Sequence, residues 1–298
     1  MASQNNQNNP YDVKEYFLYN CATKQYKLYE QMINRFFKNN AYIVLKLVRN
    51  KIQSSNSPIR NVEFYQIYKK FIFTQRPDMI KLIHADTWRQ KSFIKSVELL
   101  FSDEGKIAQD SIYIDYGCND GAFAVAIVKH FGLKPKNIYC CDLIDMPELV
   151  KEAKFNYIKI DVNNIKKSMS SVPMGDILTI VNVFHHIPPD VRGETLNVLD
   201  EKLKKNSYII VKEHNCNMGL YNEEYKELIK EWHKLYAVLY NEQDFMGKIN
   251  FISLDHLKAY MFSIHSLLKA YIIEDENDIL KSYFALFVKY RELSQIIS

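Results

Sequence analysis

The stretch Ile112-Tyr-Ile-Asp-Tyr-Gly-Cys-Asn-Asp-Gly121 decides how this chain is expected to fold. Its apolar residues alternate up to Asp115, as in a strand, and a tight loop from Gly117 to Gly121 follows. Residues 122–131 then have the apolar pattern of a helix. A strand, a glycine-bearing turn and a helix N-terminus in this order place unpaired backbone N–H groups at the carboxyl edge of a sheet. The stretch therefore predicts a nucleotide-like ligand at the edge of a doubly wound α/β sheet.

The spacing of the loop glycines distinguishes between two kinds of nucleotide site. A dinucleotide fingerprint would have glycine at positions 117, 119 and 122, but this chain has Asn119 and Ala122. The order Asp-x-Gly-x-Asn-x-Gly instead resembles the first motif of class I S-adenosylmethionine-dependent methyltransferases, Asp/Glu-x-Gly-x-Gly-x-Gly. Asn119 replaces the middle glycine, and asparagine is one of the few residues that tolerate left-handed backbone angles. The turn can therefore survive this departure from the family pattern.

The rest of the chain alternates strands and helices, as a parallel sheet requires. The resemblance covers about residues 106–298 and implies the α/β, Rossmann-like fold of class I methyltransferases, a mostly parallel sheet flanked by helices. A helix is expected to start at Pro188, and a last strand at 283–290 is expected as the antiparallel edge typical of these folds. The other strands are expected at 137–141, 157–160, 176–183 and 207–211, and two further helices at 221–240 and 254–270.

The resemblance implies S-adenosyl-L-methionine as cofactor. Asp142 ends the second strand, where the family has an acid that accepts hydrogen bonds from the ribose, and Asp161 ends the third, where an acid contacts the adenine amino group. The segment 182–189, Asn-Val-Phe-His-His-Ile-Pro-Pro, resembles the family's fourth motif beside the methyl group. Alternatively, both acids only cap the helices that follow them. The cofactor-binding residues expected on this basis are Asp115, Tyr116, Gly117, Asn119, Gly121, Phe123, Asp142, Leu143, Asp161, Val162, Asn182, Val183 and Phe184.

Polar residues at the ends of the fourth and fifth strands are the candidates for catalysis: His185, His186, Glu213 and His214. A histidine there could take a proton from a nitrogen or oxygen nucleophile as it attacks the methyl sulfonium, because its pKa lies near neutral pH. Glu213 and His214 open on the same edge of the sheet and could orient such a base. Alternatively, the histidines only shape the pocket and the other two residues only solvate the edge. Methyl transfer needs little beyond in-line placement of nucleophile and methyl, so positioning alone is a second hypothesis.

Lys212 invites a comparison with ribose 2′-O-methyltransferases, which use a Lys-Asp-Lys-Glu set. Lys91 or Lys95 would have to supply the first lysine. The fourth strand, however, ends in Asn182 and Val183 rather than aspartate, and residues 283–290 contain no glutamate. These departures count against ribose 2′-O chemistry by the usual mechanism.

Charge divides unevenly along the chain. Residues 1–100 contain 16 Lys and Arg against 7 Asp and Glu, whereas the remainder contains 23 against 28. The runs 35–38 and 64–73 mix cations with aromatic rings, as do surfaces that grip phosphates and stack bases. We therefore expect an RNA substrate, methylated at the mRNA cap or at another base. In the ordinary structural interpretation, the rings face a core and the lysines solvate helices.

Two other functions stay open at this stage. One is a small-molecule methyltransferase whose N-terminal extension forms a lid. The other is a non-catalytic cofactor-binding subunit that stimulates a protein partner, a hypothesis that Asn119 keeps open. A homo-oligomer is equally compatible with the sequence.

Composition limits the class of protein. With 47% hydrophobic residues the chain can bury a core, and no apolar run approaches the ~20 residues of a membrane helix. The polar N-terminus does not resemble a signal peptide. The five cysteines contain no Cys-x-x-Cys pair, which favours free thiols in the reducing cytoplasm and disfavours a zinc site. Abundant Lys, Asn, Ile and Tyr indicate an AT-rich genome, such as that of a virus or a protist.

Three segments are expected: a disordered tail over 1–10, a basic and mainly helical extension over 11–105, and the methyltransferase domain over 106–298. Turns are expected in the extension at 54–58 and at 76–77. Its last helix, 86–100, has the apolar residues Phe93, Ile94, Val97 and Leu100 at helical spacing, with Asp86 or Thr87 as its cap.

Overall fold

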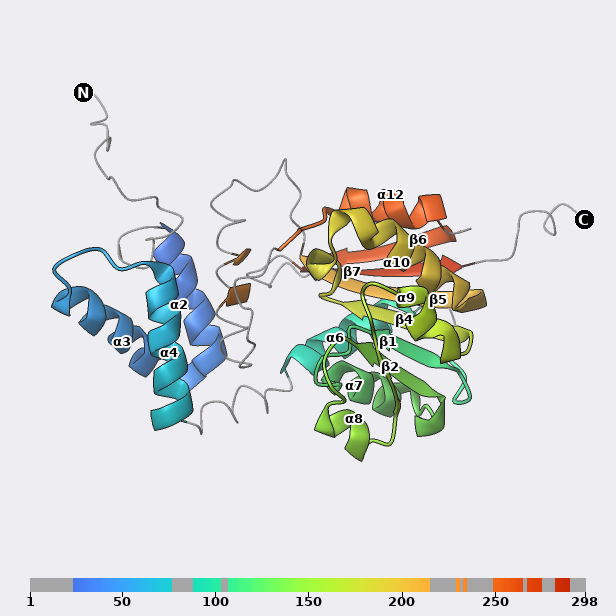
Figure 1. Ribbon diagram of the computed structural model, residues 1–298, viewed down its shortest axis with the longest axis horizontal. Coiled ribbons are helices and arrows are strands. Elements are labelled where there is room, and N and C mark those ends of the chain that lie inside the picture. The colour runs from blue at the N-terminus through green and yellow to red at the C-terminus, as the bar shows by residue number, and fades with distance from the viewer. Residues whose placement is uncertain are drawn as a thin grey trace, which may run out of the picture. The chain divides into compact units, whose positions relative to one another are not determined.

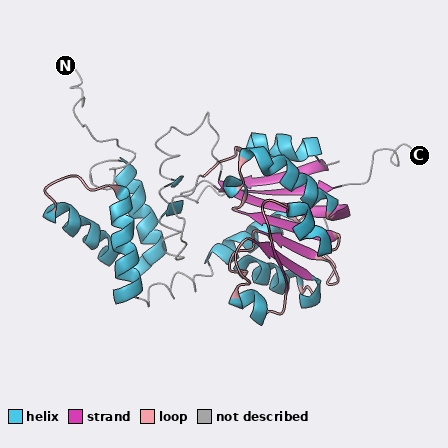
Figure 2. Ribbon diagram, in the orientation of Figure 1, coloured by secondary structure: helices cyan, strands magenta, loops and turns pink. Residues whose placement is uncertain are grey.

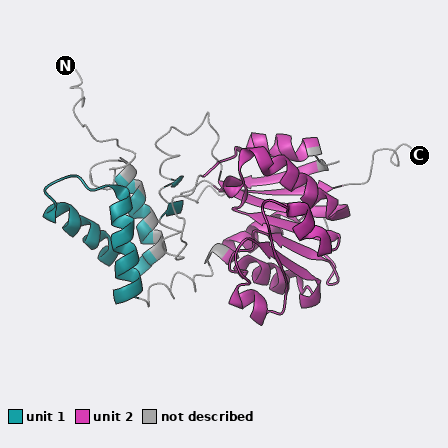
Figure 3. Cartoon of the chain, viewed as in Figure 1, with its two compact units in different colours: residues 1–86, 218–248 teal, residues 87–217, 249–298 magenta. Residues whose placement is uncertain are grey.

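The computed structural model describes residues 24–76, 88–102, 107–214, 229–230, 233–234, 249–264, 267–274 and 282–289. The chain divides into two compact units, residues 1–86 with 218–248 and residues 87–217 with 249–298 (Figure 3). The boundary expected between residues 105 and 106 lies instead near residue 87. Helix α6 (Trp88–Leu100) belongs to the second unit because Phe93, Val97 and Leu100 are buried in its core. The expected tail, 1–10, lies outside the described residues.

The described part of the first unit is helical, as predicted. It contains α2 (Lys24–Phe37), a 3-10 turn (Lys38–Asn40), α3 (Ala41–Ser54) and α4 (Asn61–Gln75). The turn expected at 54–58 is confirmed. The turn expected at 76–77 lies only partly within the described residues: Arg76 follows the end of α4, and residue 77 is outside them. The rings of Phe64, Tyr65 and Tyr68 are buried, and the Tyr29 hydroxyl donates a hydrogen bond to that of Tyr68 at 2.6 Å. For these three rings of 64–73 the structure agrees with the ordinary interpretation, in which the rings face a core, and they are not available for stacking on bases.

The second unit contains a seven-stranded sheet in the order β3-β2-β1-β4-β5-β7-β6 (Figures 1 and 2). Strands β1 to β5 are parallel, and β7 runs antiparallel to both of its neighbours. The predicted strands are confirmed, with β5 longer than expected. The bounds are β1 (Tyr113–Tyr116), β2 (Ile138–Asp142), β3 (Asn156–Lys159), β4 (Gly175–Val181), β5 (Leu203–His214), β6 (Leu267–Glu274) and β7 (Ser282–Lys289).

Two predictions near the C-terminus need correction. The helix expected over 254–270 ends at Ile264 as α12 (Leu254–Ile264), and strand β6 begins at Leu267. Consequently β7 is not the edge of the sheet, since β6 pairs along its outer side. The apolar runs that form α12 and β6 follow one another closely in the sequence, and periodicity alone does not distinguish a strand from a helix in such short runs. Of the helix expected at 221–240, only residues 229–230 and 233–234 are described.

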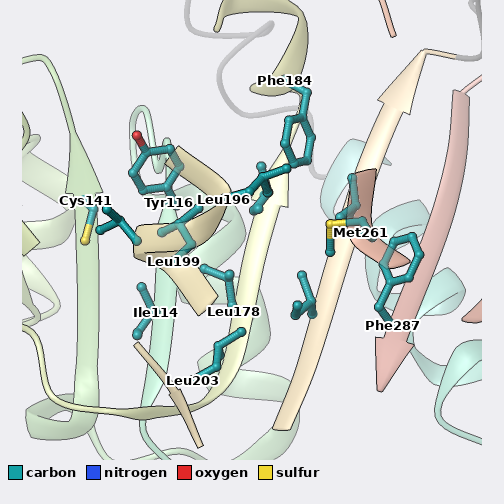
Figure 4. Packing of buried hydrophobic residues seen from close by; sticks show 14 of the residues in the cluster. Ile114, Tyr116, Cys141, Leu178, Phe184, Leu196, Leu199, Leu203, Met261 and Phe287 are labelled. Atoms are coloured by element: carbon teal, nitrogen blue, oxygen red, sulfur yellow. The ribbon is translucent and has the colours of Figure 1, made fainter. Parts of the chain in front are cut away.

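Helices cover both faces of this sheet (Figure 2). Strand residues alternate between the two cores: Ile114 and Leu178 pack with helices α9 (Ile165–Ser168), α10 (Pro189–Glu201) and α12. Figure 4 shows these two residues with Leu196 and Leu199 of α10 and Met261 of α12. Tyr113 and Ile177 face α6, α7 (Ala122–Phe131) and α8 (Glu148–Glu152) instead. A sheet buried on both faces explains the nearly continuous apolar runs of its strands. No described helix is both long and apolar enough to span a membrane.

Candidate active site

The loop between β1 and α7 is a tight turn with three left-handed residues. Gly117 and Gly121 have φ angles of 75° and 82°, and Asn119 adopts 47°, as its sequence position predicted. The Gly117 N–H donates to the Cys141 carbonyl at 2.8 Å, which fixes the loop to the end of β2. A Cβ at position 117 would lie 2.2 Å from a methyl group of Val183. The loop therefore packs directly against the segment that follows β4.

Asp142 joins the glycine loop to the segment after β2. One carboxylate oxygen accepts the Asn119 N–H at 2.7 Å, and the other accepts the Leu143 N–H at 2.6 Å. Asp161 accepts the Asn163 N–H at 2.9 Å and so caps the turn after β3. Beside these acids, the side chains of Leu143 and Val162 are more than half exposed. Two carboxylates and two exposed apolar side chains thus lie along the carboxyl edge of β2 and β3.

Asp115 is a buried carboxylate at the end of β1, only 2% exposed. One of its oxygens accepts a hydrogen bond from the Thr179 hydroxyl at 2.5 Å, and that hydroxyl is 2.7 Å from the Tyr113 hydroxyl. Its Oδ2 atom has no hydrogen-bond partner among the described residues. Burial raises the pKa of Asp115 to about 7; the Thr179 hydrogen bond lowers it, and the charges of Asp142 and Asp120 raise it.

Asn182 directly follows β4, which pairs with β1, the strand that contains Asp115. Its backbone is left-handed, with φ of 56°, and its N–H donates to the Lys212 carbonyl at 2.8 Å. Its side-chain oxygen is buried and, like Asp115 Oδ2, has no partner among the residues that the structure describes. Left-handed backbone at a residue other than glycine costs energy and is concentrated at functional sites. A buried acceptor atom without a donor in the described part of the chain therefore lies at the carboxyl end of each of the neighbouring strands β1 and β4.

His185 and Glu213 form a buried pair between the ends of β4 and β5, 0% and 1% exposed. Glu213 accepts the His185 backbone N–H at 2.9 Å and lies 2.7 Å from His185 Nδ1. Burial acts to raise the pKa of Glu213, but the charge and hydrogen bonds of His185 and the charge of His214 lower it overall. Because an ionised carboxylate only accepts hydrogen bonds, Nδ1 must carry the proton. The pair therefore fixes a proton on Nδ1 and leaves Nε2 as the other ring nitrogen of His185.

His186 and His214 lie beside this pair. The His186 ring centroid is 4.1 Å from that of His185, and the His214 centroid is 5.4 Å from it. His186 keeps exposed surface, yet desolvation by the atoms around it and the charge of His185 lower its pKa to about 4. The structure thus brings together the four residues predicted as catalytic, with His186 neutral at physiological pH.

Comparison with known proteins rests on structure alone. No protein-family model matches the sequence, and no curated protein sequence matches it. The structure is similar to that of a proposed O-methyltransferase from Nostoc punctiforme, with a TM-score of 0.50 and 12% identity over 90% of this chain and 74% of that one. It is also similar to phosphoethanolamine N-methyltransferase 2 of Haemonchus contortus in complex with S-adenosyl-L-methionine, with a TM-score of 0.50 and 13% identity over 75% and 60% of the two chains. The chain has the class I methyltransferase fold.

In this methyltransferase fold, three of the predicted cofactor-binding residues lie in the two cores beside the loop. Phe123 packs edge-on against Phe93, with ring centroids 4.9 Å apart. Tyr116 and Phe184 are buried in the core on the other face of the sheet. Their rings therefore pack in the cores on the two faces of the sheet and support the glycine loop and the segment after β4.

Four residues of this site were not predicted from the sequence. Thr179 and Tyr113 connect to Asp115, and their polar groups in otherwise apolar strands were the available signal, because buried polar groups need partners. Arg192 donates to the carbonyls of Ile187, at 3.0 Å, and of Asn250. The Asn250 N–H in turn donates to the His185 carbonyl at 2.7 Å. Residue 250 is far from α10 in sequence, so no local pattern could have identified this connection.

Proposed function

We propose that this protein is an S-adenosylmethionine-dependent methyltransferase. The observation that carries the proposal is the negative character of the glycine loop: the carboxylates of Asp120 and Asp142 lie beside it, and Asp115 Oδ2 and Asn182 Oδ1 lack donors among the described residues. At ~5 Å and an effective dielectric of ~20, one unit charge interacts with a carboxylate by about 3 kcal/mol. The sign of the ligand's charge therefore decides which ligand binds at this loop: a cationic group is attracted by the carboxylates, and a pyrophosphate is repelled.

The residues present fit this cofactor. S-adenosylmethionine has an ammonium group and a sulfonium centre but no phosphate, and when bound it would supply a methyl group on positively charged sulfur. Asp115 and Asn182 offer acceptors to cationic and N–H groups, and Asp142 offers oxygens to ribose hydroxyls. Leu143 and Val162 offer exposed apolar surface to the adenine ring. The similarity of the fold to methyltransferase structures adds support to this assignment.

The His185–Glu213 pair is suited to remove a proton from the methyl acceptor. Glu213 holds the proton on Nδ1, so Nε2, which is buried in this structure, is the nitrogen that would accept an N–H or O–H proton from an acceptor that enters beside it. The negative charge of Glu213 then stabilises the imidazolium that forms, at a distance of 2.7 Å. Positioning of acceptor and methyl supplies the rest of the rate.

Cofactor binding is the first test of this function. We expect S-adenosylmethionine and its demethylated product to bind with micromolar-range affinity and to raise the melting temperature by mass action. Asp142→Ala should weaken binding by about tenfold or more, because ribose hydroxyls would lose a charged acceptor. Asp145→Ala is the matched control, since Asp145 is three residues away and its side chain is 94% exposed. If neither ligand gives heat or a thermal shift at millimolar concentration, the proposal fails.

RNA is the substrate that we propose, on the charge of the first unit. Residues 24–76 contain eleven Lys and Arg but only two Glu. Exposed lysines lie on all three helices, and Tyr42 on α3 is a 67% exposed ring. A cationic surface with an exposed ring fits a single-stranded polyanion whose bases can stack. The exposed lysines used in the test are Lys27, Lys46, Lys51 and Lys70.

Reversing these four charges tests the RNA assignment. For the wild type, log K for single-stranded RNA should fall by ~0.7 per neutralised phosphate for each tenfold rise in salt. The quadruple Lys→Glu variant should bind every RNA sequence more weakly, with unchanged cofactor affinity. A matched quadruple reversal in the second unit, at exposed Lys129, Lys136, Lys167 and Lys205, controls for net charge. A flat salt dependence in filter binding would refute RNA and favour a small-molecule acceptor.

A tritiated methyl-transfer screen over capped RNA, uncapped RNA, protein and small-molecule extracts then identifies the acceptor. Cofactor binding without transfer to any fraction would favour the non-catalytic subunit instead.

A further inference from the structure

Asp115 has an unusual combination of one tightly held oxygen and one open oxygen. Tyr113, Thr179 and the Asp115 Oδ1 atom form a continuous chain of hydrogen bonds inside the sheet. Oδ2 is buried, without a partner among the described residues. A carboxyl group in this setting is costly to ionise until a positive charge arrives beside it.

We infer that Asp115 is protonated in the empty site and releases its proton to solvent when the cationic cofactor binds. This inference rests on the proposed function, because it requires a ligand with positive charge at the glycine loop. It adds a property that the fold alone does not imply, namely that cofactor affinity rises with pH below neutrality.

Within the described part of the chain, the titratable groups that face Asp115 are anionic or neutral. Asp120 in the loop and Asp142 at the end of β2 add negative charge, which favours the protonated form. Tyr113 on β1 and Cys141 on β2 both have a pKa raised by burial, so both are neutral at pH 7. The Cys118 thiol is also neutral, because its hydrogen bond to Cys140 and its burial raise its pKa. The ionisation of Asp115 is therefore governed by burial, two carboxylates, Thr179 and the incoming ligand.

Proton linkage fixes the expected pH dependence. Where the free protein holds a proton that the complex lacks, affinity rises by up to tenfold per pH unit. With the pKa of Asp115 at about 7, this rise should extend from about pH 5.5 to 7 and then level off. The α-amino group of the ligand loses its own proton near pH ~7.7–8.0. Affinity for S-adenosylmethionine should therefore fall again at higher pH.

Calorimetry in buffers of different ionisation enthalpy measures the released protons directly. At pH 6.5 the full-length wild type should release ~0.5–1 proton on binding S-adenosylhomocysteine. Asp115→Asn should bind with no proton release at this pH and with affinity independent of pH from 5.5 to 7. The neutral analogue 5′-methylthioadenosine, which lacks the ammonium and sulfonium groups, should bind the wild type without releasing a proton.

A second variant keeps the test decisive if Asp115→Asn binds no ligand. Thr179→Val removes the hydrogen bond that lowers the pKa of Asp115, so the profile of proton release should move to higher pH. Thr195→Val is the matched control, because the buried Thr195 hydroxyl donates only to its own helix, at the Val191 carbonyl. Binding with buffer-independent heat at pH 6.5 and flat affinity from pH 5.5 to 7 would overturn this inference and leave the proposed function intact. No binding of either charged ligand would overturn the proposed function itself.

Discussion

Replacing Glu213 by glutamine should change the tautomer of His185 while preserving the fold. The carboxylate accepts the His185 N–H, the His185 Nδ1–H and, at 3.3 Å, the His214 N–H. Glutamine keeps one acceptor oxygen for the backbone N–H and presents an amide N–H to Nδ1. The ring can satisfy this donor only by moving its proton to Nε2, so Nε2 becomes a donor and no longer a base.

The size of the effect follows from these contacts. Exchange of one charged hydrogen bond for a neutral one costs about 1–2 kcal/mol of the free energy of unfolding. Glu213→Ala removes every acceptor and leaves buried donors unpaired, which costs about 3–5 kcal/mol. If His185 is the general base, turnover of Glu213→Gln should fall by ~10²–10⁴ with cofactor affinity unchanged.

Two measurements check this prediction. Long-range ¹⁵N–¹H spectra of histidine-labelled protein report which ring nitrogen carries the proton, and single-turnover methyl transfer reports the chemical step. Glu98→Gln is the matched control, because Glu98 lies 3.6 Å from His130 in an exposed pair. Wild-type ring shifts together with wild-type turnover in Glu213→Gln would refute the argument. Altered shifts with normal turnover would leave positioning as the mechanism.

Three further predictions concern stability. Gly117→Ala should lower the free energy of unfolding by about 1–3 kcal/mol, because φ is 75° and the new methyl meets Val183; Gly193→Ala, with nothing within 4 Å, should be neutral or stabilising in urea titrations. Because the pKa of Asp115 is raised to about 7, the free energy of unfolding should fall as pH rises from about 4 to 7, where the unfolded chain ionises this residue and the folded protein keeps it protonated. The stability of Asp115→Asn should depend less on pH over that range. The lowered pKa of His186 means that stability is lost as pH falls from about 6.5 to 4, and His186→Gln should remove that part of the acid denaturation curve.

The sequence predicted the parts of the site that depend on local order. The strand, loop and helix over 112–131 form as expected because their glycine spacing and periodicity act over a few residues. The strand-end positions of Asp142 and Asp161 follow from the same alternation of elements. Contacts fixed by strand register could not be predicted in this way. Thr179 meets Asp115 only because β4 lies beside β1 with these two residues in register.

The same limit explains the errors near the C-terminus. Strand β6 forms because it pairs with β7. The first pair joins Leu267 of β6 to Lys289 of β7, which are not neighbours in sequence. The connection from Arg192 through Asn250 to His185 also depends on tertiary packing. Periodicity in one chain carries no information on either pairing.

The geometry of the loop separates two requirements that the glycine motif combines. Gly117 and Gly121 must lack a side chain, because a Cβ would lie 2.2 Å from Val183 and 2.5 Å from Val150. Position 119 requires only a left-handed backbone, and Asn119 provides it, with an exposed side chain and an N–H that donates to Asp142. Substitution of the middle glycine therefore leaves both the close packing of the loop and the orientation of Asp142 intact. The departure that kept a degenerate cofactor-binding subunit open is therefore no evidence against a functional loop, and methyl transfer itself becomes the measurement that separates that subunit from an enzyme.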